Sequence, residues 1–137
     1  MQAVAELFVR DEGQLGFYQA ELARLTDSGW SPTIPPLYVT VTNFRLILVP
    51  QTRKPYPPAS IPSNYITRVW HISDAHRDGI ALSLRTGHEL FMFTHWQQSV
   101  GLERDLKSML IMPVSHRFSH TLAQRDISRL IRFVERI

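Results

Sequence analysis

Cysteine is missing from this sequence of 137 residues. Its absence excludes disulfides, thiolate metal sites and cysteine nucleophiles, and it is compatible with a reducing compartment such as the cytoplasm. Long apolar runs are missing too, since none approaches the roughly 18 residues that a membrane span needs. The first residues lack a basic stretch and reach an acidic side chain at Glu6, so we expect no secretory signal peptide.

Catalytic motifs are also missing. The sequence has no glycine-rich phosphate loop, no G-x-S-x-G elbow, no H-E-x-x-H and no acidic metal cluster. His116 and His120 have the spacing of two metal ligands on one helix face, but without a third ligand nearby they favour surface histidines. We therefore expect no enzyme, no cofactor and no metal. An enzymatic or small-molecule-binding barrel that uses His71, His76 or His95 with neighbouring acids is the alternative.

The excess of positive charge is confined to the end of the chain. Lys and Arg number 15 against 12 Asp and Glu, yet residues 1–112 hold ten of each. Residues 113–137 hold five arginines and two acids. A nucleic-acid-binding domain usually spreads a basic footprint over its main surface, so we do not favour nucleic acid as a partner. Nucleic-acid binding through the C-terminal arginines is kept as an alternative.

The middle of the chain has the period of β-structure. Apolar and polar residues alternate over Leu37–Thr42, and Asn43 makes a turn into the apolar run Phe44–Val49, which predicts a hairpin. The segment from Pro50 to Pro62 contains five prolines and predicts a stiff loop. Further strands are predicted at Tyr65–Ile72, Ile80–Arg85 and His88–His95, with turns at Asp78-Gly79 and Thr86-Gly87.

Two amphipathic helices follow. The first has Thr94 and Gln97 in capping-box positions, ends before Pro113, and carries an apolar stripe of Leu102, Leu106, Met109 and Leu110. The second begins near Thr121, with a stripe of Ala123, Ile127, Leu130, Ile131 and Val134. At the other end of the chain, Phe17–Leu25 fits either a strand or a helix, and Ser28–Pro36 reads as a loop.

Three segments resemble landmarks of one family. The run Leu37–Ile47 (LYVTVTNFRLI) resembles the hairpin of GRAM and related pleckstrin-homology-like (PH-like) domains. Ser60-Ile61-Pro62, followed by Ile66 and Val69, is similar to that family's next strand. Leu82–Phe93, with its Thr86-Gly87 turn, is similar to the hairpin that leads into the closing helix. Within this likeness Thr42 and Asn43 would hold the first hairpin, and Arg45 would pair with a carboxylate or backbone carbonyls.

The resemblance and the periodicity predict the same architecture. We expect a mainly β (α+β) fold: a PH-like bent antiparallel β-barrel of about seven strands, closed by an amphipathic helix, because an open barrel end needs an apolar lid. The predicted boundaries are residues 1–112 for the barrel with its capping helix, and 113–137 for a linker and an additional C-terminal amphipathic helix.

The resemblance implies a non-enzymatic interaction module, with a protein partner ranked ahead of an anionic membrane. Many phosphoinositide-binding members place several cations around the first two strands, whereas Glu21–Leu37 offers only Arg24. For the membrane, the candidate residues are Arg53, Lys54 and Tyr56 at the tip of the proline-rich loop, where two cations give weak attachment of about 1 kcal/mol each. The alternative is an ordinary solvated loop. The location implied is cytoplasmic, peripheral to a membrane if lipid is bound.

The candidate partner-binding residues lie elsewhere. Trp30, in a proline-rich loop, is expected to be exposed. The second helix carries an arginine row opposite its apolar stripe, with the acidic residues on the flanks: Arg125, Arg129, Arg132 and Arg136. If the barrel does not need the stripe, the stripe could pair with a second subunit and give a weak homo-oligomer. A helix that covers leftover core with a solvated basic face is the alternative.

Overall fold

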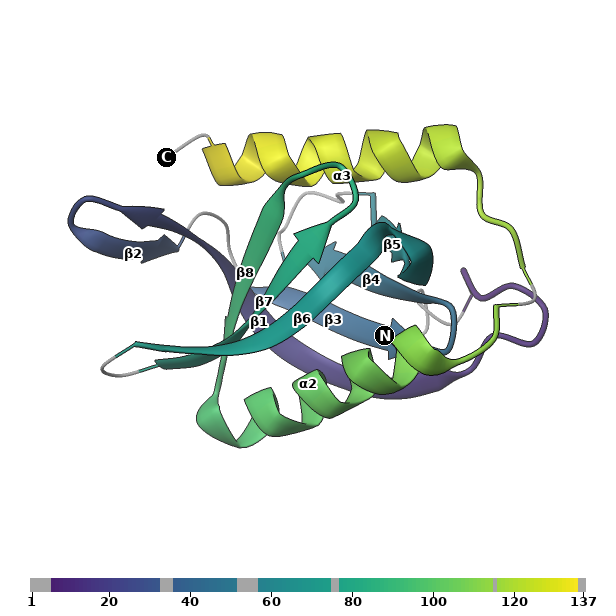
Figure 1. Ribbon diagram of the computed structural model, residues 1–137, viewed down its shortest axis with the longest axis horizontal. Coiled ribbons are helices and arrows are strands. Elements are labelled where there is room, and N and C mark those ends of the chain that lie inside the picture. Colours follow the sequence, from purple (N-terminus) through teal and green to yellow (C-terminus); the bar gives the residue numbers. More distant parts are fainter. Residues whose placement is uncertain (1–5, 33–35, 52–56, 75–76, 115, 136–137) are drawn as a thin grey trace.

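The computed structural model describes residues 6–32, 36–51, 57–74, 77–114 and 116–135. This part of the chain holds eight strands, a 3-10 turn and two long helices (Figure 1). The elements are β1 (Gln14–Thr26), β2 (Gly29–Pro32), β3 (Leu37–Thr42), β4 (Arg45–Pro50), β5 (Ala59–Pro62), η1 (Ser63–Tyr65), β6 (Ile66–Asp74), β7 (Arg77–Leu84), β8 (Glu89–Thr94), α2 (Trp96–Ile111) and α3 (His120–Glu135).

The strands form one antiparallel sheet in the order β5-β4-β3-β1-β8-β7-β6, with β2 paired to the end of β1. β1 belongs to both halves of this sheet: Gln14–Ala20 pairs with β3, and Glu21–Ala23 pairs with β8. The predicted mainly β, PH-like architecture is confirmed. The sheet itself is not a continuous ring, because no pairing joins β5 to β6 among the described residues. Pro62, which has no N–H to donate, ends β5, and η1 turns the chain away before β6 begins.

The structure shows which of two alternatives Phe17–Leu25 adopts, and it corrects the predicted loop at Ser28–Pro36. Phe17–Leu25 lies within a strand, since pairing with β3, β8 and β2 outweighs the helix propensity of its alanines and leucines. Ser28–Pro36 is not all loop, because Gly29–Pro32 forms β2 and returns along β1. The turn before β2 uses Gly29 at φ +111°, a conformation that favours glycine.

Aliphatic side chains fill the interior between the two halves of the sheet. Leu22, Val39, Leu46, Ile80 and Met92 are all fully buried there. The same core includes the apolar stripes of both helices, which lie on opposite sides of the β-framework (Figure 1). Burial of this kind of surface stabilises a fold by about 25 cal/mol per Å², so both helices contribute to one core.

α2 carries the predicted stripe, with Leu102, Leu106 and Met109 fully buried. Its predicted capping box is wrong. The N-cap is His95, without a side-chain cap, because Thr94 still pairs with Asp78 at the end of β8 and its hydroxyl donates to the His95 carbonyl. Neither α2 nor α3 has the length and hydropathy of a transmembrane helix.

Glycine is unfavourable in the middle of a helix, but packing explains its presence at position 101. A Cβ placed on it would lie 2.9 Å from the Tyr18 hydroxyl. That hydroxyl donates a hydrogen bond to the carboxylate of Asp105, which is 7% exposed. The glycine therefore lets β1 approach α2 closely enough for a tyrosine–aspartate bond between the two elements.

The Tyr18–Asp105 bond predicts a pH dependence of stability. Burial of the hydroxyl, together with its hydrogen bond to Asp105, raises the pKa of Tyr18 from 10.0 to about 12. Because the folded-state pKa lies above the unfolded value, the interaction stabilises the fold fully below pH 10 and is lost as pH rises through about 12. Urea unfolding should therefore show wild type more stable than Tyr18→Phe near neutral pH, with the difference shrinking above pH 10. A difference that stays constant across that range would contradict the linkage.

α3 begins one residue earlier than predicted, because Ser119 rather than Thr121 caps it. The Ser119 hydroxyl accepts the N–H of Leu122 at 3.3 Å, and its carbonyl accepts the N–H of Ala123 at 3.0 Å. The predicted stripe is confirmed: Ala123, Ile127, Leu130 and Ile131 are buried and Val134 is partly buried. The stripe packs within its own chain, so it is not the free surface that the oligomer hypothesis assumed.

α3 also covers the outer edge of β5. The carboxylate of Asp126 accepts the N–H of Ser60 at 3.0 Å, and Arg129 donates to the carbonyl of Pro58 at 3.1 Å. Arg129 and Asp126 also pair with each other at 3.2 Å. These two side chains supply an acceptor and a donor to the edge strand, as a neighbouring strand would.

The roles expected in the first hairpin are confirmed. Thr42 Oγ1 accepts the N–H groups of Phe44 and Arg45, both at 3.0 Å. The side chain of Asn43 accepts the N–H of Gly13 and donates to the backbone of the same N-terminal segment. Arg45 makes a two-pronged ion pair with Glu12, at 2.9 Å and 3.0 Å. The hairpin thus holds the segment that precedes β1.

Candidate functional site

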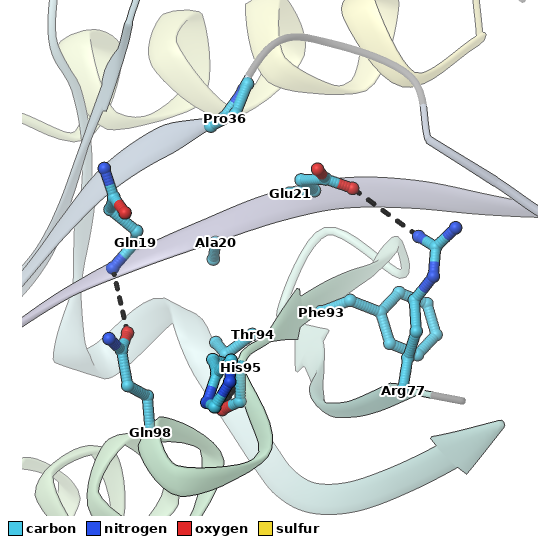
Figure 2. A pocket seen from close by; sticks show the side chains of 9 residues that line it. All are labelled: Gln19, Ala20, Glu21, Pro36, Arg77, Phe93, Thr94, His95 and Gln98. Carbon is cyan, nitrogen blue, oxygen red and sulfur yellow. Dashed lines mark hydrogen bonds and ion pairs between the residues drawn. The ribbon is translucent and has the colours of Figure 1, made fainter. Parts of the chain in front are cut away.

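A polar hollow of about 390 Å³ opens where β1 changes partners from β3 to β8. Figure 2 shows two polar contacts across it, one between a side chain and the backbone and one between two side chains. Gln98 Oε1 accepts the N–H of Gln19 at 3.2 Å, and Arg77 meets Glu21 at 3.5 Å. The Arg77 guanidinium also lies 5.7 Å from the ring centre of Phe93. Because these groups already satisfy one another, this hollow offers a balanced surface with little free charge.

A second surface, which we name the linker face, surrounds the segment between α2 and α3. Two adjoining hollows, of about 330 and 550 Å³, share Ser63, Asn64 and Val114. The first is bounded by η1 and the linker, and the second by the start of β6 and the end of α2. The cationic or imidazole side chains that line them are Arg85, His116, Arg117 and His120. None of the described residues that line either hollow is acidic.

Aromatic contacts hold the linker face in place. Phe118 packs edge-on against Phe44 at 6.5 Å and His116 at 4.6 Å, and the Arg45 guanidinium lies over it at 4.6 Å. The hydroxyl of Tyr65, which is itself buried, is hydrogen-bonded to His120 Nδ1. The linker is therefore anchored to the β-framework at the end that leads into α3.

Arg85 adds an exposed cation to the linker face, and Ser63 adds a hydroxyl from a buried residue. The Arg85 guanidinium lies 6.0 Å from the centre of the Tyr65 ring, and the backbone N–H of Arg85 donates to the Tyr65 carbonyl at 2.8 Å. Ser63 is 7% exposed and lines both hollows. An anionic group resting on this face would meet donors from three separate parts of the chain.

The predicted membrane-binding residues Arg53, Lys54 and Tyr56 lie outside the described residues, and so does Arg136. The rest of the arginine row is not uniform. Arg125 and Arg132 are exposed, whereas the side chain of Arg129 is 23% exposed and occupied at the β5 edge.

The expectation that acidic residues flank the row without interrupting it is wrong. Asp126 lies between Arg125 and Arg129 and contacts both, at 3.9 Å and 3.2 Å. Partner binding by Arg125 and Arg132 stays a prediction.

Trp30 is not as exposed as expected. Its ring packs edge-on against Phe91 and Phe93, with ring centres 4.8 and 5.2 Å apart, and the residue is partly buried. The pairing of β2 with β1 brings the ring over β8, which its position in a proline-rich segment did not indicate. Partner binding by Trp30 stays a prediction for the part of the ring that is exposed.

The two described histidines of the enzymatic alternative, His71 and His95, belong to different surroundings. His71 pairs with Asp78 at 3.4 Å on the exposed surface of β6 and β7. His95 lines the polar hollow at the start of α2, and His76 lies outside the described residues. The described histidines thus sit at the surface of a framework whose interior is packed with aliphatic side chains.

Sequence reasoning missed most of the linker face. It noticed His116 and His120 for their spacing, and it passed over Ser63, Asn64 and Arg117. One signal was present in the sequence: no acidic residue lies between Asp105 and Asp126.

The fold is PH-like: a bent antiparallel sheet that shares β1 between its halves, followed directly by a covering helix. No protein-family model and no curated protein matches the sequence, so the GRAM resemblance is not confirmed.

Among solved structures, the chain is similar to the C-terminal domain of an unknown protein from Leishmania infantum, with 13% identity and a TM-score of 0.56 over 80% of this chain and 90% of that one. It is also similar to the complex of PDZ-RhoGEF DH/PH domains with GTP-gamma-S activated RhoA, with 10% identity and a TM-score of 0.49 over 80% of this chain and 32% of that one. At these identities the likeness concerns the fold alone.

Proposed function

We propose that the chain is a non-enzymatic PH-like interaction module that binds an acidic segment of a protein partner on the linker face. The observation that supports this most is the charge of that surface. Arg85, Arg117, His116 and His120 line two adjoining hollows that no acidic residue among the described lining residues offsets. A surface that carries positive charge attracts a negatively charged ligand, and the positions of the cations fix how the ligand is aligned on it.

The apolar part of the linker face supports a peptide ligand. Leu110, Met112 and Val114 line the larger hollow, and beside them Ile111 is 86% exposed. Interfaces between proteins combine an apolar centre with a charged rim. An extended segment that alternates acidic and apolar side chains would fill the hollows and meet the cations at their borders.

The membrane alternative has less support. Weak binding to an anionic bilayer needs several cations on one face, whereas residues 1–112 carry balanced charge. The loop of Arg53, Lys54 and Tyr56 lies outside the described residues. Lipid binding there stays a prediction that the geometry neither favours nor opposes.

The finer classification is also a proposal. We infer a GRAM-type domain because the first and third landmarks of the resemblance each span one hairpin, whereas the second is divided between β5 and β6. Leu37–Ile47 spans the β3–β4 hairpin, Ser60-Ile61-Pro62 lies in β5, and Leu82–Phe93 spans the β7–β8 hairpin. The cysteine-free composition supports a cytoplasmic location.

Charge reversal on the linker face tests the proposed function. A fluorescein-labelled dodecapeptide of alternating glutamate and leucine should bind the wild-type chain and lose affinity with rising salt. Arg85→Glu with Arg117→Glu should weaken binding by at least about tenfold, because each charge-assisted contact contributes about 1.5–3 kcal/mol. Fluorescence anisotropy measures this directly.

Lys107→Glu is the matched control, since it reverses an exposed cation on the outer face of α2 that pairs with Glu103. Its affinity should stay within about twofold of wild type. Equal affinity of the double variant and the wild type, or no binding by the wild type, would overturn the proposal.

A further inference from the structure

The smaller hollow of the linker face is lined by the hydroxyl-bearing side chain of Ser63. This residue is 7% exposed and also lines the larger hollow. A hydroxyl at the wall of a hollow can donate a hydrogen bond to an acceptor atom of a ligand that occupies the hollow.

Further donors surround the same hollow. Arg117 is exposed and makes no ion pair with any described residue. Asn64 is exposed and supplies an amide. The bond from Tyr65 to His120 Nδ1 fixes that imidazole and leaves Nε2 available. His116 adds a second ring at the border.

These donors match an oxyanion with several acceptor atoms. A guanidinium fork, a hydroxyl, an amide N–H and an imidazole N–H together exceed what one carboxylate can accept, whereas a phosphoryl group has three strong acceptor oxygens and nearly two negative charges. The hollow also lies at the start of α3, whose first turn contains no acidic residue. The helix dipole there adds to the attraction for an anion.

We propose that this hollow receives a phosphoryl group on a serine, threonine or tyrosine side chain of the partner segment. This inference rests on the proposed function, because the rest of the segment would occupy the larger apolar hollow beside it. The phosphoryl oxygens would accept hydrogen bonds from Ser63, Asn64 and Arg117. We assign this group to a protein rather than to a lipid for two reasons. The apolar hollow beside it suits the side chains of a peptide. Residues 1–112 carry no net charge, so most of the chain would not be attracted to an anionic membrane.

The test is an amide-resolved NMR titration of the full chain with a small probe, N-acetyl-O-phosphoserine methylamide, at constant ionic strength. The glutamate analogue, N-acetylglutamate methylamide, is the comparison ligand. The phosphoserine probe should shift the amides of Ser63, Asn64 and His120, with a dissociation constant about tenfold or more below that of the glutamate analogue. N-acetyl-O-phosphotyrosine methylamide extends the test to an aromatic carrier.

Two variants and a control establish the site. Ser63→Ala, a change of one oxygen atom, and Arg117→Gln should each weaken phosphoserine binding by about fivefold or more. Lys107→Gln, which removes one positive charge from an exposed site on α2, should leave it unchanged. Unchanged binding by both Ser63→Ala and Arg117→Gln would overturn the inference.

The outcomes separate this inference from the proposed function. If the glutamate–leucine peptide binds the linker face but phosphoserine binds no tighter than its glutamate analogue, the phosphoryl inference fails and the proposed function stands. If neither the peptide nor the probe binds, both fail. If vesicles of phosphatidylcholine with phosphatidylinositol phosphate bind through Ser63 and Arg117 while both phosphoamino acid probes do not, the ligand is a lipid headgroup and the inference is overturned.

Discussion

Replacing Arg45 with methionine should lower the free energy of unfolding by about 3–5 kcal/mol, as expected when one partner of a buried ion pair is removed. The carboxylate that remains, on Glu12, has a fully buried side chain, and Arg45 supplies two of its hydrogen bonds. The same guanidinium also donates to the carbonyl of Leu7 at 2.7 Å. Equilibrium unfolding in urea, followed by tryptophan fluorescence, measures the loss.

A second ion pair provides the control for this prediction. Lys107 and Glu103 lie 3.0 Å apart on the surface of α2, with side chains 58% and 24% exposed. Lys107→Met should cost no more than about 0.5 kcal/mol. Replacing Arg45 and Glu12 together by methionine and leucine should recover much of the stability, because no buried charge is left alone. A loss for Arg45→Met as small as the control would show that water solvates the Glu12 carboxylate.

Truncating Ile127 to alanine should destabilise the whole chain by about 2–5 kcal/mol. Ile127 lies on α3, is 1% exposed, and belongs to the same core as the strands and α2. The cavity left behind would lie against the framework rather than in a separate unit. Urea unfolding should therefore give one transition, shifted to lower denaturant.

Leu122→Ala is the matched control, because Leu122 lies on the same helix and is 49% exposed. Its effect should stay within about 0.5 kcal/mol. The pair of variants also tests the predicted boundary at residue 112. If residues 113–137 formed a separable addition, Ile127→Ala would give a second, earlier transition and leave the main one in place.

Elements with a strong local pattern could be predicted from the sequence. β3 and β4 follow from alternation on either side of Asn43, and the two helices follow from apolar stripes at helical spacing. The structural role of Arg45 could also be predicted, because the residue follows a hairpin turn and its planar guanidinium matches the geometry of a carboxylate. In each case a few neighbouring residues carry the information.

Elements that depend on distant partners could not be predicted. β1 is a strand because β3, β8 and β2 pair with it, and β2 exists because Trp30 packs on Phe91 and Phe93. The predicted cap of α2 is wrong for a related reason, because Thr94 is held by its strand pairing with Asp78.

The candidate site depends even more on residues that are far apart in the sequence. The bond between Tyr65 and His120 joins residues 55 positions apart, and the hollow beside it combines η1 with the segment between two helices. The spacing of His116 and His120 points to this segment, but it carries no information on the residues of η1 that lie beside it. The place of Arg129 in the arginine row concealed its contact with Pro58, which only the packing of α3 on β5 reveals.

The cover that α3 gives to β5 has a consequence for solubility. Open sheet edges are templates for uncontrolled strand addition between molecules, and here Asp126 and Arg129 occupy the groups that such addition would use. The same helix also buries part of the core. Any event that detaches α3 would therefore expose the unpaired edge of β5 and an apolar surface of the core at the same time. Detachment of α3 should therefore lead to aggregation.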